Sequence, residues 1–190
     1  MPKSTLLIIG HQVVFQAMFL IKNIYLQHKT GKSIRGKNTE ANYSILFFTA
    51  FISCSVLLSF FKSPIGTIQY VDPFTAALLS LPLILSNLVI GAASLLNMKD
   101  SWRVGIIESQ RTPLVEHGIY QFSRNPYFLS YLLMFGAYTV LLQNIILLGL
   151  SIIGFILIHS MINTEEEYLQ SIHGEAYVQY KLRVPKYFIR

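Results

Sequence analysis

The sequence predicts an all-α fold, a polytopic membrane bundle of about five transmembrane helices. The first observation is composition: 53% of the 190 residues are hydrophobic and only 13% are charged, whereas soluble domains carry about 25% charged residues. The second is that the apolar residues form runs of about 20, the length that crosses a bilayer core. One cysteine, Cys54, cannot form an internal disulfide, and no Cys/His spacing indicates a metal site.

Three apolar runs in the first hundred residues predict three spans, at Thr5–Tyr25, Tyr43–Phe61 and Pro73–Met98. The first run contains polar residues and lacks a small-residue cleavage site after it. It is therefore interpreted as a retained span and not as a signal peptide.

The last apolar region, Pro126–Ile162, predicts a helical hairpin. Its 37 residues are too many for one span, and a polar pair, Gln143-Asn144, interrupts it near the middle. Two spans joined by a tight turn at this pair account for both features. The predicted total is five spans.

Charge asymmetry predicts the orientation of the bundle. Thirteen of the 15 basic residues fall in the first loop, the third connection and the C-terminal tail. An odd number of spans places these three segments on one side, which the positive-inside rule makes cytoplasmic, with the N-terminus outside. The basic residues are Lys22, Lys29, Lys32, Arg35 and Lys37, then Lys99, Arg103, Arg111 and Arg124, then Lys181, Arg183, Lys186 and Arg190. Because they lie in short loops beside apolar runs, the net charge of +6 indicates membrane lipids and not nucleic acid as the partner.

Polar residues collect in two cytoplasmic segments that flank the hairpin, Asp100–Asn125 and Thr164–Arg190. A site built from these segments faces water on one side and lipid on the other. That arrangement suits a soluble cofactor that meets a lipophilic substrate. The sequence therefore predicts a cytoplasmic cofactor pocket.

The residues Arg124-Asn125-Pro126 predict the start of the hairpin's first helix, because Asn is a good N-cap and Pro a good first helical residue. Free backbone N–H groups beside Arg124 favour an anion such as a carboxylate or phosphate. The alternative is that Arg124 is only a positive-inside anchor and Tyr127 an interfacial aromatic.

An acidic run, Glu165-Glu166-Glu167, follows the last predicted span. Apolar spacing after it and His173-Gly174 as a stop predict that the helix continues. The run is either a solvated acidic turn or supplies a carboxylate that holds an amino group or cation near Arg124.

Several other polar and aromatic residues have candidate structural or functional roles. His159 shares a helical face with Asn163 and Glu167, and is either a proton acceptor or an interhelical hydrogen-bonding residue. His11 is interpreted as an interhelical polar contact and Trp102 as an interfacial anchor. The tail contains two tyrosines, Tyr177 and Tyr180, which either line a site or lie at the membrane interface.

Taken together, these segments resemble the isoprenylcysteine carboxyl methyltransferase family of integral membrane methyltransferases. The resemblance runs from about Ser101 to Tyr187 and depends on an ordered set of motifs. These are Leu114-Val115-x-x-Gly118-x-Tyr120, Arg124-Asn125-Pro126, the apolar hairpin, Glu165-Glu166-x-x-Leu169, Gly174, Tyr177-x-x-Tyr180 and Arg183-Val184-Pro185. It divides the chain into three N-terminal spans (1–100) and a methyltransferase region (101–190).

The resemblance implies S-adenosylmethionine as methyl donor, bound on the cytoplasmic side, and a carboxyl-O-methyltransferase-like activity on a lipophilic acceptor. It implies Arg124, Glu165 and Glu166 as catalytic residues and no metal. The implied cofactor-binding residues are Thr112, Pro113, Leu114, Val115, Tyr120, Asn125, Pro126, Tyr127, Phe128 and Glu165. Methyl transfer is an in-line displacement, and the chain offers few bases, so positioning and desolvation are expected to supply catalysis.

The sequence departs from the family at three positions. Asn125 stands where the family has His, Phe128 replaces a tyrosine, and Met161 stands where eukaryotic enzymes have an arginine for the substrate carboxylate. The acceptor is therefore an isoprenylcysteine-like carboxylate or another lipid-like molecule. Two other function classes remain alternatives: an NADPH-dependent membrane reductase similar to sterol reductases, and a membrane protein without enzymatic activity.

Overall fold

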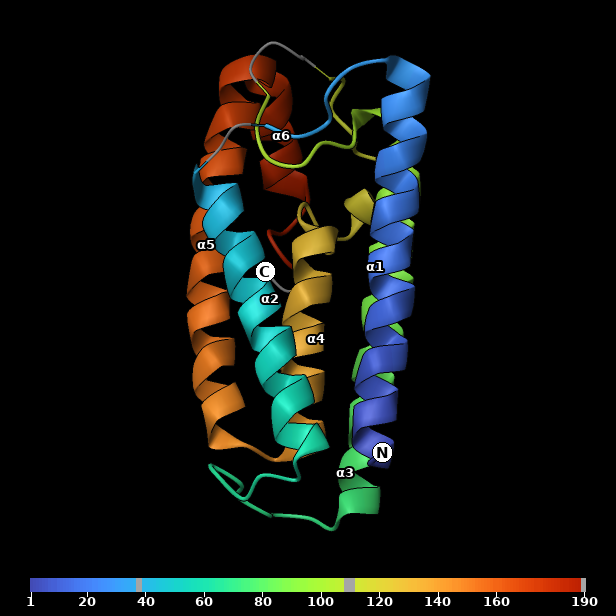
Figure 1. Ribbon diagram of the computed structural model, residues 1–190. Coiled ribbons are helices and arrows are strands. Elements are labelled where there is room, and N and C mark those ends of the chain that lie inside the picture. Colours follow the sequence, from blue (N-terminus) through green and yellow to red (C-terminus); the bar gives the residue numbers. More distant parts are fainter. Residues whose placement is uncertain (37–38, 108–111, 189–190) are drawn as a thin grey trace.

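The structure is a computed structural model that describes residues 1–36, 39–107 and 112–188. Three basic residues of the orientation argument, Lys37, Arg111 and Arg190, lie outside the described residues. The helices run in the order α1 (Lys3–Thr30), α2 (Thr39–Phe60), α3 (Pro73–Asn97), η1 (Lys99–Ser101), η2 (Gly118–Gln121), α4 (Pro126–Leu142), α5 (Ile145–His173) and α6 (Glu175–Arg183). The five long helices stand side by side, and α6 lies near one end, beside the last turns of α5 (Figure 1).

The five predicted spans correspond to α1 to α5, and the helical membrane bundle is confirmed. Four of these helices are long and apolar enough to cross a membrane, and α4 is a shorter apolar helix of 17 residues. At 1.5 Å per residue α4 is about 26 Å long, whereas α1 and α5 reach about 42 and 44 Å. A hydrocarbon core of about 30 Å holds Ile145–Ile162 of α5, so its last turns extend beyond the core.

The hairpin turn forms at Gln143-Asn144 as predicted. Asn144 caps α5, because its side chain accepts hydrogen bonds from two backbone N–H groups of the first turn. Gln143 adopts a left-handed conformation and binds the loop after α2, accepting from the N–H groups of Tyr70 and Val71 at 2.9 and 3.0 Å. The turn is therefore fixed to the α2–α3 loop at the end of the bundle opposite α6 (Figure 1).

An aromatic core holds the helices together. Phe135 and Tyr138 of α4 are almost fully buried and contact Phe51 of α2. Gly154 of α5 permits this packing, since a Cβ there would lie 2.5 Å from the Phe135 ring. Large aliphatic side chains cover the outer faces of the helices, as expected where lipid is the solvent.

The three basic segments gather at one end of the bundle. The loop after α1 and the connection after η1 form a short backbone bridge there, with Val104 N donating to Ile34 O and Gly36 N to Val104 O. The α6 helix and the C-terminal residues lie at the same end (Figure 1). The first turn of α4 lies farther from this end of the bundle than the last turns of α1 and α5 do (Figure 1).

Candidate active site

A cavity of about 490 Å³ lies at the end of the bundle where α4 begins. Its polar side is formed by the loop before η2, the start of α4, the acidic turn of α5 and α6. Its apolar side is formed by α2, by the first turns of α4 and by Phe19 of α1. The volume is in the range that binds small organic ligands.

The structure places most of the expected site residues in this one cavity. Residues separated by more than 50 positions in the sequence meet there because the bundle brings α4, α5 and α6 together at one end. Pro126 and Glu166 do not line it. Those that do are Thr112, Pro113, Leu114, Val115, Tyr120, Arg124, Asn125, Tyr127, Phe128 and Glu165.

The acidic run lies on a continuous helix, as expected, and its three carboxylates point in different directions. Successive residues of an α-helix are turned by about 100°, so Glu165 faces the cavity, Glu166 is buried against Arg124, and Glu167 is exposed. The helix ends where the sequence indicates, with Gly174 as the C-cap residue.

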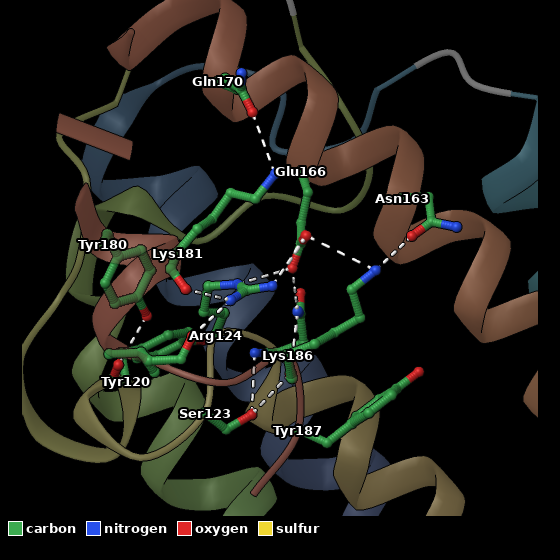
Figure 2. Close-up of polar contacts among 12 residues, drawn as sticks. Tyr120, Ser123, Arg124, Asn163, Glu166, Gln170, Tyr180, Lys181, Lys186 and Tyr187 are labelled. Carbon is green, nitrogen blue, oxygen red and sulfur yellow. Dashed lines mark hydrogen bonds and ion pairs between the residues drawn. The ribbon is translucent and has the colours of Figure 1, made fainter. Parts of the chain in front are cut away.

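Arg124 and Glu166 form a buried ion pair. The Arg124 Nε atom lies 3.0 Å from Glu166 Oε1 and Nη2 lies 3.2 Å from Oε2, with both side chains less than a tenth exposed. Arg124 Nη1 also donates to the carbonyls of Lys181 and Val184 at the end of α6. Figure 2 shows the guanidinium between these groups. The pair therefore joins the start of α4, α5 and the C-terminal tail.

Asn125 does not cap α4, contrary to the sequence prediction. The helix starts at Pro126 as expected, but the Asn125 side chain makes no capping hydrogen bond. Its Nδ2 donates instead to Glu166 Oε1 at 3.0 Å and to the Lys186 carbonyl at 3.2 Å. A buried carboxylate next to the helix start competes successfully for the amide, because charge-assisted hydrogen bonds are the stronger ones.

The Glu165 carboxyl group lines the cavity and has a pKa close to neutral pH. It lies beyond the hydrocarbon-spanning part of α5, and burial, reinforced by the charge of Glu166, raises its pKa to about 7. Burial also raises the pKa values of Tyr120, Tyr177 and Tyr180, which therefore remain protonated. Glu165 is thus poised to gain a full negative charge when a cation enters the cavity.

Gly118 and Asn97 fix the position of Tyr120. Gly118 has a φ of +63°, and a Cβ there would lie 1.6 Å from Asn97 Oδ1, which accepts a hydrogen bond from the Ile119 N–H at 2.7 Å. The Tyr120 carbonyl in turn accepts from the Tyr180 hydroxyl at 2.7 Å. Both tail tyrosines, Tyr177 and Tyr180, are buried and line the cavity.

Trp102 is not an interfacial anchor, contrary to the sequence prediction. It is 5% exposed, lines the cavity, and donates its indole N–H to Asn23 Oδ1 at 2.9 Å. Its ring lies 4.6 Å from that of Tyr127, and Phe19 lies close to both. These rings form an aromatic wall because the connection after η1 folds back over α1.

His159 does not line the cavity. Its Nδ1 lies 3.2 Å from the Tyr187 hydroxyl, and Asn163, one turn further along α5, accepts from Lys186. This face of α5 therefore holds the C-terminal tail (Figure 2). His11 makes the interhelical contact expected of it, with hydrogen bonds to Tyr138 and Asn87.

Part of the cavity wall was not expected from the sequence. The α2 helix contributes an apolar stripe that includes Ile45, Phe48 and Ile52, and Gln16 of α1 also reaches the cavity. An apolar stripe on a membrane helix does not indicate whether it faces lipid, protein or a ligand. The sequence does indicate a polar face inside the first span, because Gln12 and Gln16 are four residues apart and so lie on the same side of a helix. This spacing could have indicated that Gln16 reaches a polar cavity.

The model of one protein family, described as phospholipid methyltransferase, matches residues 75–176, more than half of the chain. The chain belongs to the phospholipid methyltransferase family. The matched region contains α3 except its first two residues, the hairpin, and every residue expected in the cofactor site. The expectation of a membrane methyltransferase is therefore confirmed. No curated protein sequence matches the chain.

Proposed function

We propose that this phospholipid methyltransferase family member transfers the methyl group of S-adenosylmethionine to a membrane lipid. One observation carries the proposal: a single cavity extends from the Glu165 carboxylate and the start of α4 to the apolar stripe of α2. Its two sides match a charged, water-soluble donor and a lipophilic acceptor.

The residues present fit the donor. Its carboxylate suits the first turn of α4, where the N–H groups of Tyr127 and Phe128 have no carbonyl of a preceding helical turn to bind. Its ammonium group suits Glu165, and its adenine suits the apolar backbone at Leu114 and Val115. The sulfonium suits the aromatic wall, because ring faces attract cations. When bound, this cofactor supplies an electrophilic methyl group.

The side chains that line this cavity are expected to promote the reaction in two ways, by aligning the methyl donor with the acceptor and by excluding water from around them. Alignment of reacting groups within about 3–3.5 Å can supply about 7–11 kcal/mol of the barrier. Trp102, Tyr127 and Phe128 line the cavity with aromatic rings, and a bound donor and acceptor packed against these rings displace water, which strengthens the electrostatic contacts made there. Arg124 and Glu166 act through the fold: they hold the start of α4 and the tail and so position Glu165.

The apolar side supports a lipid acceptor. Phe48 and Ile52 line the cavity from α2, and α1 and α2 diverge from their contact at Ser59 toward the end that carries α6 (Figure 1). Met161 lines the cavity at the position where a carboxylate acceptor would need a cation, and it accepts a hydrogen bond from Ser44. This favours a lipid other than a prenylcysteine carboxylate.

The positive-inside rule supports a cytoplasmic cavity and an external N-terminus, since the cavity lies at the basic end of the bundle. Single cysteines at Lys32 and at Lys62, in a Cys54→Ser background, test this orientation in inverted and right-side-out vesicles. An impermeant maleimide should label position 32 only in inverted vesicles and position 62 only in right-side-out ones. The opposite pattern contradicts the orientation.

Calorimetry of the detergent-purified protein tests the cofactor. The expected result is that the protein binds S-adenosylmethionine and S-adenosylhomocysteine, that Glu165→Gln binds both at least about tenfold more weakly, and that Glu167→Gln binds them like the wild-type protein. The two substitutions are chemically identical, but Glu167 is exposed on the opposite side of α5. Binding of NADPH alone indicates the reductase, and no binding by any of the three to folded protein indicates a role without enzymatic activity.

A further inference from the structure

The residues that follow α6 bind the segment that leads into α4. The Arg124 N–H donates to the Pro185 carbonyl at 3.0 Å. The Lys186 carbonyl accepts from the Ser123 hydroxyl and from the Asn125 amide, both at 3.2 Å. Three consecutive residues of one segment thus hold two consecutive residues of the other. The backbone of the tail is therefore fixed at Lys186, beside the acidic run of α5.

The Lys186 side chain extends from this fixed point to α5 (Figure 2). Its Nζ donates to Asn163 Oδ1 and lies 3.8 Å from Glu166 Oε2, and the side chain is only 25% exposed. Glu166 Oε1 accepts from both Arg124 and Asn125. Among the described residues, Oε2 has one hydrogen bond, from Arg124 at 3.2 Å. The Lys186 ammonium therefore lies at the carboxylate oxygen that has fewer donors.

Lys186 completes a balance of charge around the acidic run. Glu165 and Glu166 are consecutive, and burial together with the charge of Glu166 raises the pKa of Glu165 to about 7. When Glu165 is ionised, the two carboxylates are balanced by two cations, Arg124 and Lys186. Without the Lys186 ammonium one negative charge would remain uncompensated. Ionisation of Glu165 would then be less favourable, because like charges disfavour each other's charged form.

The other groups that surround the two carboxylates were considered from every element packed against them. Tyrosines of η2, α5, α6 and the tail are neutral below about pH 9, and arginines are charged throughout. Two further groups on α5, His159 and Glu167, are tested by their own variants. The tyrosines are Tyr120, Tyr168, Tyr177, Tyr180 and Tyr187, and the arginines are Arg35, Arg103 and Arg124.

We propose that Lys186 is a positioning residue of the donor site: its ammonium acts through Glu166 and keeps Glu165 ionised for the ammonium group of the donor. The inference rests on the proposed function, because an ionised Glu165 is useful only if a cationic donor binds there. Lys186 does not line the cavity. It acts from the far side of α5, where Glu166 faces the tail.

Calorimetric titration of the full chain with S-adenosylhomocysteine, from pH 5.5 to 8.5, tests this role. Lys186→Met keeps a long side chain and removes its charge. The acidic decline of affinity should move to higher pH by about 0.2–0.7 unit, the size expected for a partly exposed ion pair. The Kd should therefore rise about 1.5- to 5-fold at pH 6 and by less than about 1.2-fold at pH 8.5. A variant that only loosened the fold would bind more weakly at both pH values.

Two other substitutions at this position separate charge from shape. Lys186→Arg keeps the charge and should bind like the wild-type protein. Lys186→Gln removes the charge, keeps a hydrogen-bond donor for Asn163, and should show the same shift as Lys186→Met.

Matched controls come from the same end of the bundle. Lys181→Met makes the identical substitution on α6, where the Lys181 ammonium binds Gln170 at an exposed position, and should leave the pH profile unchanged, as should Glu167→Gln and His159→Phe. A wild-type profile in Lys186→Met, an equal loss of affinity at pH 6 and pH 8.5, or the same shift in Lys181→Met overturns the proposal. Absence of S-adenosylhomocysteine binding in the wild-type protein refutes the proposed function itself.

Discussion

Replacing Glu165 by glutamine removes one negative charge from the cavity and leaves the shape of the side chain almost unchanged. A hydrogen bond between charged partners contributes about 1.5–3 kcal/mol, so the Kd for S-adenosylhomocysteine should rise about 10- to 150-fold. Glu167→Gln, two residues along the same helix and exposed, should bind like the wild-type protein.

The pH dependence of binding follows from the raised pKa of Glu165. In the free protein this pKa is about 7, so the carboxylate is progressively protonated below that pH and binding weakens, by at most tenfold per pH unit. The α-ammonium of S-adenosylhomocysteine stands beside its own carboxylate, so it keeps its charge to a higher pH than a peptide N-terminus, whose pKa is about 7.7–8.0. Affinity should therefore rise up to about pH 8 and fall only at more alkaline pH.

Isothermal titration from pH 5.5 to 9, with the protein in detergent, measures both effects. Glu165→Gln should lose the decline on the acidic side and keep the one on the alkaline side. An acidic decline that persists in Glu165→Gln, or equal losses of affinity in the Glu165 and Glu167 variants, refutes the assignment of the ammonium to Glu165.

The same pKa makes a prediction for the ligand-free protein. Because the pKa of Glu165 is raised above its ordinary value of 4.5, the folded state binds a proton more tightly than the unfolded state between these values. This contribution favours folding at low pH and is lost as the pH rises toward 7. Glu165→Gln should therefore raise the midpoint of thermal unfolding at pH 8, where Glu167→Gln should not.

The other predictions concern the residues around the cavity. Gly118→Ala should destabilise the fold by about 2 kcal/mol or more, because the left-handed conformation disfavours a Cβ and the contact with Asn97 is lost; denaturant unfolding measures this, and an unchanged midpoint contradicts it. Arg124→Met should cost about 3 kcal/mol, because it removes the bidentate partner of buried Glu166 and leaves it only the Asn125 amide and the more distant Lys186 at 3.8 Å. The double variant Arg124→Met, Glu166→Met should recover much of this loss in the same assay. Trp102→Leu should weaken S-adenosylmethionine more than S-adenosylhomocysteine in calorimetry, since only the former carries the sulfonium cation, and equal weakening refutes the aromatic contact. His159→Phe should change methyl transfer to lipid by less than about twofold, because His159 contacts Tyr187 of the tail and Phe155 of its own helix and does not line the cavity. Abolished transfer with intact cofactor binding restores a catalytic role.

Length and hydropathy were sufficient to predict the spans and the hairpin. Pro126 and Asn144 start helices where expected, because helix-start chemistry is local in sequence. The continuation of α5 through the acidic run was predicted for the same reason, from apolar spacing and the stop at Gly174. These features depend on neighbours within a few positions along the chain.

Features that depend on partners distant in sequence were not predictable. Asn125 is drawn from its cap position by Glu166, 41 residues later. Trp102 is buried because the connection after η1 folds over Asn23 of α1. The sequence predicted that Glu165 and Glu166 lie near the site. It did not predict their different roles, because these depend on which face of α5 each residue occupies: Glu165 lines the cavity and Glu166 pairs with Arg124.

Transfer of a labelled methyl group into lipid tests the central claim most directly. The purified protein is reconstituted with a total membrane lipid extract and S-adenosylmethionine carrying a radiolabelled methyl group, and the label in the organic phase is counted. The proposed function predicts lipid-bound label with the wild-type protein and with Glu167→Gln, and at least about tenfold slower labelling with Glu165→Gln when S-adenosylmethionine is below its Kd. Absence of label in the lipid phase with folded wild-type protein, or equal incorporation by Glu165→Gln, contradicts the account.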